Sequence, residues 1–346
     1  DADEEIARWD EELEVVLRNE AIDSITVKVE NIYGHGAGEA WHNSVRFFRN
    51  TGKIRYQGTV HNQLVGMSQS AAASVVIYHK GYCLDTEKEE QKYQRTTGLL
   101  KKEIEKDPTN PRYHHYLAVA YLGRHHYDKA IEAGCRALGL VESGIPADDL
   151  YLWTRFVVAV SHMNTGNSEA AQTLCRESIA QNQNHLDAYY LLASLAFSQD
   201  DMTSFVGHSD RYVSLIKQLR ADSSRFGGMV HNTIQHEWRI HLHRGVAYTA
   251  LGEQKQARKA YARAEKTCRS KSDYYKHRAL IHTGRSEFTE AARFIKKALA
   301  GNPGDAELLQ AKSVLSQHQD TSAPQDEMKN PQQPEAASGA ETLSLC

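Results

Sequence analysis

Hydrophobic positions divide the chain into three zones, and the first covers residues 1–85. Here Ile6, Trp9 and Leu13 recur at helical spacing within an acidic opening, which predicts a first helix. Segments of alternating apolar residues then predict short strands at 25–29, 45–48, 54–60 and 75–78. This zone therefore indicates an α/β fragment that is too small to be a complete two-layer enzyme domain.

The middle zone, residues 86–317, is helical in period throughout and repeats itself. Small residues recur with offsets of 12 and 7, as in Ala118, Ala130 and Ala137. Three more triplets share this spacing: Ala159, Ala171 and Ser178; Gly245, Ala257 and Ala264; Ala279, Ala291 and Ala298. Small side chains at such points allow two antiparallel helices to approach closely. Turns between the helices are expected at Gly123, Gly166, Gly252 and Gly284.

The repeated strings YHHYLAVAYLGRHHYDKAIEAGCRAL and WRIHLHRGVAYTALGEQKQARKAYARA resemble the tetratricopeptide repeat, a helix-turn-helix unit of 34 residues. Units beginning near Trp238, Ser272 and Ala306 have this period, and the last helix would cap the array. A unit near Leu186 is degenerate, because Phe205 and Tyr212 stand where small residues are expected. Extra residues up to about Gln235 predict a loop or a short helix after it.

Resemblance to this repeat family implies a concave groove lined by fixed positions of each first helix. Carried onto this sequence, the aromatic and methionine members of the groove are Trp153, Phe156, Met163, Tyr190 and Phe197. Such a groove could receive a peptide or a neighbouring domain. The alternative is that several of these side chains pack between adjacent repeats.

Composition and charge narrow the choice of partners. Lys plus Arg number 41 against 44 for Asp plus Glu, so the net charge of −3 gives no reason to expect a nucleic-acid partner. No apolar run approaches the length of a membrane span, and the five cysteines form no C-x-x-C pair, which favours a reducing, cytoplasmic setting. The third zone, residues 318–346, holds three of the seven prolines and is expected to be disordered.

The first zone carries a second resemblance. The opening D-A-D-E-E precedes WHNSVRFFRNTGKIRYQGTVHNQL and VVIYHKGY, and this order resembles the family 2 glycosyltransferases of GT-A fold that carry tetratricopeptide repeats after the catalytic domain. The implied reaction is transfer of a sugar from a nucleotide-sugar donor to an unknown acceptor. The implied fold class is mostly α: a partial GT-A-like α/β domain over 1–85, an α-solenoid over 86–317, and the tail over 318–346.

That resemblance also implies site residues. Asp1, Asp3 and His61 would hold Mg²⁺ or Mn²⁺, which neutralises the diphosphate leaving group. Trp41, Arg46 and Arg49 would bind substrate, although a buried aromatic and a solvated arginine face are the alternatives. In the family an acidic residue often follows the histidine of G-x-V-H, whereas this chain has Asn62. The acceptor-activating carboxylate would then be Glu4.

Whether the chain is an enzyme stays open at this point. It begins at Asp1 without Met and does not include the nucleotide-binding strands expected before that residue, so we expect it to be a truncated fragment. The competing hypothesis is a non-enzymatic repeat scaffold whose groove binds a protein partner.

Overall fold

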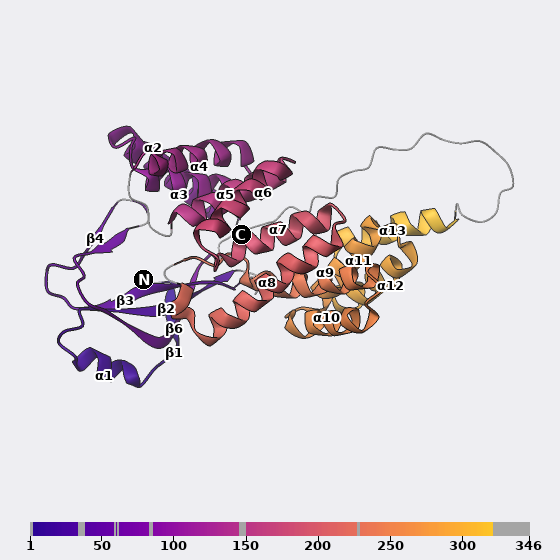
Figure 1. Ribbon diagram of the computed structural model, residues 1–346, viewed down its shortest axis with the longest axis horizontal. Coiled ribbons are helices and arrows are strands. Elements are labelled where there is room, and N and C mark those ends of the chain that lie inside the picture. The colour runs from indigo at the N-terminus through magenta and orange to yellow at the C-terminus, as the bar shows by residue number, and fades with distance from the viewer. Residues whose placement is uncertain are drawn as a thin grey trace. The chain divides into compact units, whose positions relative to one another are not determined.

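A computed structural model describes residues 3–33, 39–58, 60, 62–82, 86–144, 150–226 and 229–320. It is mostly helical, with a small mixed β-sheet formed by its N-terminal part (Figure 1). The chain divides into one packed unit that ends at His236 and another that begins at Glu237, and each is considered by itself. None of the helices in the described ranges is both long and apolar enough to cross a membrane.

Four strands form the sheet in the order β1-β6-β2-β3. Strand β6 runs antiparallel to β1 and parallel to β2, and β3 runs antiparallel to β2. Strands β4 and β5 form a separate antiparallel pair. The elements of this region are β1 (Glu4–Arg8), α1 (Glu12–Arg18), β2 (Ser24–Tyr33), β3 (Glu39–Phe48), β4 (Arg55–Gln57), β5 (Gln63–Val65) and β6 (Ser70–Tyr82).

The predicted opening helix is wrong in its first half, because residues Glu4–Arg8 form strand β1 and the helix starts only at Glu12. Backbone pairing with β6 decides this, and Ile6 is left 51 % exposed opposite Ile77. Helix α1 instead buries Leu13 against one face of the sheet. The four predicted strands are confirmed as β2, β3, β4 and β6, whereas the three-residue β5 was not predicted.

Helices make up the remainder of the first unit and the whole described part of the second, and consecutive helices pack on each other. The first unit contains α2 (Thr86–Lys106), α3 (Pro111–Leu122), α4 (Tyr127–Glu142), α5 (Leu150–Asn164), α6 (Ser168–Gln181), α7 (Leu186–Ser198), α8 (Met202–Ala221), and the 3₁₀ turns η1 (Ser223–Phe226) and η2 (Ile234–His236). The second contains α9 (Glu237–Ala250), α10 (Gln254–Thr267), α11 (Lys271–Gly284), α12 (Phe288–Gly301) and α13 (Ala306–Asp320).

The predicted small-residue positions are confirmed as the contact points between helices. Every small residue of the four triplets is buried, Ala118 and Ala130 completely. The approach is close enough that a Cβ on Gly245 would lie 2.4 Å from the ring of Tyr261. The spacing in sequence therefore reflects helix packing in both units.

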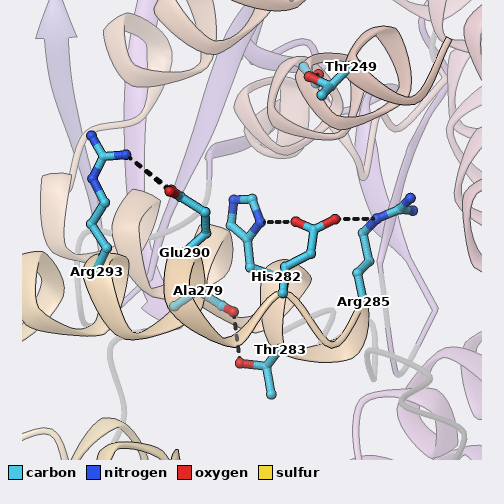
Figure 2. Close-up of polar contacts among 9 residues, drawn as sticks. Thr249, Ala279, His282, Thr283, Arg285, Glu290 and Arg293 are labelled. Carbon is cyan, nitrogen blue, oxygen red and sulfur yellow. Dashed lines mark hydrogen bonds and ion pairs between the residues drawn. The ribbon is translucent and has the colours of Figure 1, made fainter. Parts of the chain in front are cut away.

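The turns within the repeats share one backbone geometry, in which one residue has a positive φ. Two of the predicted turn glycines do not occupy that position. In each turn a residue with positive φ follows the first helix: His125, Gly166, Asp200, Gly252 and Ser286. The next N–H bonds the carbonyl five residues back, as from Glu287 to His282 at 2.9 Å. Figure 2 shows His282 and Arg285 of that turn. Both side chains contact the carboxylate of Glu287. Gly123 and Gly284 instead sit two residues before the left-handed position.

The degenerate unit α7–α8 also has a structural explanation. Phe205 and Tyr212 are fully buried at the positions where other units have small residues. In the regular units the small side chains allow a neighbouring helix to approach. In this unit the Tyr212 hydroxyl instead donates a hydrogen bond to the main-chain carbonyl of Thr233. Tyr212 therefore contacts an inserted segment, residues 229–236, which we call the insert, whereas Phe205 packs edge-on against Phe197 of α7.

Candidate functional site

Polar side chains gather at one end of the four-stranded sheet, where three neighbouring strands place Glu4, His79 and Asn31 in register. The Nδ1 of His79 lies 3.0 Å from the Asn31 amide oxygen, and its Nε2 lies 3.2 Å from a carboxylate oxygen of Asp3. Gly81 is required here, because a Cβ on it would lie 2.4 Å from Asp3 and 2.7 Å from His79. The end of the sheet thus holds a histidine between an amide and a carboxylate.

An ion pair crosses the same face of the sheet. Arg46 on β3 donates to both carboxylate oxygens of Glu4 on β1, at 2.9–3.1 Å, although these strands are the two opposite edges. Beside them, burial and then the positive charge of Arg46 lower the pKa of His42 to about 4, so its imidazole is neutral at pH 7. The pair ties the two edges together, and the Glu4 carboxylate is already engaged by a guanidinium.

Of the remaining residues expected from the glycosyltransferase resemblance, only Arg49 has a described side chain. Asp1 and His61 lie outside the described residues, as does the side chain of Trp41. Within the described ranges no group of three His, Cys, Asp or Glu side chains is arranged to hold a metal ion. Arg49 donates to the main-chain carbonyls of Leu17, Asn19 and Ile22, so its contacts tie the end of β3 to α1 and to the loop after it.

The five predicted groove residues fall into two groups. Phe156 and Tyr190 are buried, 2 % and 3 % exposed, which leaves little surface for a ligand. Trp153, Met163 and Phe197 are half-buried. The Trp153 ring packs edge-on against His115, with the ring centroids 4.7 Å apart.

The insert contacts helix α7 through a buried carboxylate and an aromatic ring. Asp187 is only 1 % exposed, and its two oxygens accept four hydrogen bonds from the insert. The main-chain and side-chain groups of Asn232 bond one oxygen, and those of Thr233 bond the other, at 2.6–3.0 Å. Tyr190 packs against His236, with ring centroids 5.8 Å apart. Asp187 and the predicted groove residue Tyr190, both on α7, are thus contacted by the insert.

Sequence reasoning missed this arrangement, although it contained one signal. Asp187 is the single charged residue of the helix LDAYYLLASLAFS, and a buried carboxylate in an apolar helix requires partners. Which residues supply them could not be read from the sequence, since they follow 45 and 46 positions later.

Residues 99–132 match the tetratricopeptide repeat family. These residues span the end of α2, all of α3 and the start of α4. The chain therefore contains a tetratricopeptide repeat region, and its architecture is a mostly helical repeat array preceded by a small mixed sheet. No curated protein matches the sequence.

Several solved repeat proteins are similar to part of this chain, at low identity and with TM-scores below 0.5. The Cut9–Hcn1 hetero-tetramer of APC/C is 17 % identical over 65 % of this chain, with a TM-score of 0.48, and this chain spans 40 % of the length of that one. A thermophilic TPR protein of Thermus thermophilus is 21 % identical, over 60 % of this chain and 99 % of its own, at a TM-score of 0.40. YrrB, a TPR protein with an unusual peptide-binding site, is 13 % identical over 62 % of this chain and 97 % of its own, at 0.40. None of these matches supports a glycosyltransferase domain.

Proposed function

We propose that this chain is a protein-interaction module whose repeat helices bind a peptide segment of a partner protein. The observation that carries the proposal is the half-buried Trp153 on the first helix of a repeat. Tryptophans of this kind frequently anchor interfaces because they bury a large area at low entropy cost. Met163 on the same helix, α5, adds an adaptable apolar contact.

The insert limits where such a peptide can lie. Because Asp187 and Tyr190 are engaged by residues 229–236, the open part of the groove in the first unit runs over α3 and α5. A peptide with a large apolar side chain next to Trp153 fits this stretch. Binding would be moderate, as is usual for a small interface with one aromatic anchor.

Peptides selected by phage display on the immobilised chain test this proposal. A selected peptide is expected to bind Trp153→Ala at least tenfold more weakly than the wild type, in fluorescence anisotropy. Met163→Ala is expected to weaken binding of the peptide about threefold. This second variant leaves the Trp153–His115 contact in place, so its effect does not come from lost packing around His115. The matched control is Arg136→Ala, an exposed residue of α4. Equal loss in all three variants, or in none, would contradict the proposal.

A second candidate function, metal-dependent sugar transfer, is favoured by one observation: Asp3, Glu4 and His79 lie together at the end of the sheet. In that reading Asp3 would bind Mg²⁺ or Mn²⁺ together with Asp1 and His61, and Arg46 would position Glu4. Both carboxylate oxygens of Glu4 accept hydrogen bonds from Arg46, so an acceptor hydroxyl would have to compete with the guanidinium for them.

Titration of Mn²⁺ by electron paramagnetic resonance tests this second function without requiring turnover. Asp3→Asn is expected to weaken Mn²⁺ binding at least tenfold, whereas Asp128→Asn, an exposed acid of α4, is expected to leave it unchanged. If the wild type binds Mn²⁺ no better than Asp3→Asn does, the metal-site hypothesis is wrong. The proposal of a protein-interaction module is unaffected by that result.

A further inference from the structure

A polar recess of about 450 Å³ lies between α2 and the turn that joins α3 to α4. One wall is a single face of α2, formed by Glu90, Tyr93, Thr97 and Lys101 at successive turns of the helix. The recess is within the size range of sites for small ligands. It is distinct from the Trp153 groove, because none of the predicted groove residues lines it.

The opposite wall consists of Tyr121, Arg124, His126 and Lys129. Helix α4, 16 residues long, begins here, and its N-cap residue His126 makes no side-chain capping bond. The His126 ring instead lies 3.1 Å from the Tyr93 hydroxyl on α2. The first-turn N–H groups of α4 and its dipole therefore add positive potential to this wall.

Charges in the recess are unbalanced. Arg124 is paired with Glu90, with nitrogen and oxygen 2.6 Å apart, and with Glu89, with nitrogen and oxygen 3.9 Å apart. Lys129 lies above the ring of Tyr121, 5.8 Å from its centroid. Within the described ranges, neither Lys101 nor Lys129 has an acidic atom within 4.0 Å of its ammonium group. Arg124 thus faces two acids, and among the described residues the cations of the lining that have no acidic partner are Lys101 and Lys129.

We propose that this recess binds a phosphate monoester dianion, with Lys101 and Lys129 as its ligands. A dianion balances the two lysines, whereas a carboxylate would leave one of them uncompensated. Ammonium groups on flexible stems are effective phosphate ligands as point charges. The monoester could belong to a small metabolite or to a phosphoserine in a peptide, because a recess of about 450 Å³ has room for the phosphate and for the group that carries it.

Isothermal titration at constant ionic strength tests the proposal with the full chain. The probes are inorganic phosphate, N-acetyl-phosphoserine amide, a phosphoserine peptide, and glutamate as the carboxylate counterpart. Both phosphoserine compounds are expected to bind saturably. Lys101→Gln/Lys129→Gln is expected to weaken them at least tenfold. The matched control, Lys102→Gln, changes an exposed neighbour on α2 that does not line the recess, and is expected to stay within twofold of the wild type.

The outcomes show whether the recess binds a phosphate monoester and, if it does, which kind of molecule carries the phosphate. Equal affinity for the free amide and the peptide supports a small-molecule ligand, whereas tighter binding of the peptide supports a partner protein. The proposal is overturned if no phosphoserine compound binds, if glutamate binds as tightly, or if the double variant and Lys102→Gln behave alike. Circular dichroism of each variant shows whether it is folded. The single variants Lys101→Gln and Lys129→Gln are measured in the same way, so that a loss of folding is not mistaken for a loss of binding.

Discussion

The carboxylate of Asp187 accepts a hydrogen bond from the hydroxyl of Thr233, 2.6 Å away and 46 residues later in the chain. With the three other bonds from Asn232 and Thr233, it holds the insert against α7. A buried carboxylate with four donors is a strong anchor, because each charge-assisted bond exceeds a neutral one in strength. The degenerate repeat is therefore a site of intramolecular recognition.

Asp187→Asn is expected to loosen the insert, because the amide nitrogen would face donors where the carboxylate offers acceptors. Loss of roughly 2–3 kcal/mol of local stability is expected. Hydrogen exchange measures it directly, since the amides of Asn232 and Thr233 both bond Asp187. Their protection should fall about a hundredfold. Asp128→Asn is the control, and unchanged protection in Asp187→Asn would show that the insert is held by its apolar contacts.

Acidification is expected to destabilise the same region. Burial, and then the nearby charge of Arg155, lower the pKa of His185 to about 4; burial lowers that of His231 to about 4, with Asp187 partly opposing the shift. An unfolded histidine titrates near pH 6.5, so the unfolded chain binds more protons between pH 6.5 and 4. Stability should therefore fall as the pH is lowered through that window.

Thermal unfolding followed at intervals from pH 7 to 4.5 checks this expectation. The melting temperature of the wild type should drop, and His185→Gln should show a shallower dependence because one titrating group is gone. His125→Gln replaces an exposed histidine and should keep the wild-type slope. A slope that His185→Gln leaves unchanged would place the pH sensitivity elsewhere.

Two glycines of α4 are expected to respond in opposite directions to alanine. A Cβ on Gly134 would lie 2.3 Å from a methyl group of Val158, whereas Gly139 has nothing within 4 Å. Gly134→Ala should cost about 1–3 kcal/mol through overpacking. Gly139→Ala should be neutral or stabilising by up to about 1 kcal/mol, as expected for a helix interior. Urea denaturation of both variants gives the comparison, and similar destabilisation by the two would contradict close packing of α4 on α5.

The left-handed turn position gives a second pair of opposite changes. Gly252 has a φ of +78°, so Gly252→Ala should cost about 1 kcal/mol. Ser286, at φ +60°, occupies the same position in the next repeat, so Ser286→Gly should be neutral or stabilising by a few tenths of a kcal/mol. Thermal unfolding of the two variants tests this. Stabilisation by Gly252→Ala would show that the turn does not require positive φ.

Local periodicity in the sequence determined most of the secondary structure and the repeat architecture. The 12-and-7 spacing of small residues predicted the helix contacts because close packing admits only small side chains there, and those residues are buried as expected. Alternation likewise predicted β2, β3, β4 and β6. These features depend on residues that are close in the sequence, within one strand or one helix-turn-helix unit.

Tertiary structure alone decided the features that join distant residues. Residues Glu4–Arg8 form an edge strand because β6 supplies its hydrogen bonds, against the helical spacing of its side chains. The Arg46–Glu4 pair spans 42 residues and connects opposite edges of the sheet. The insert docks on Asp187 because a buried carboxylate needs donors, and only the folded chain brings Asn232 and Thr233 to it.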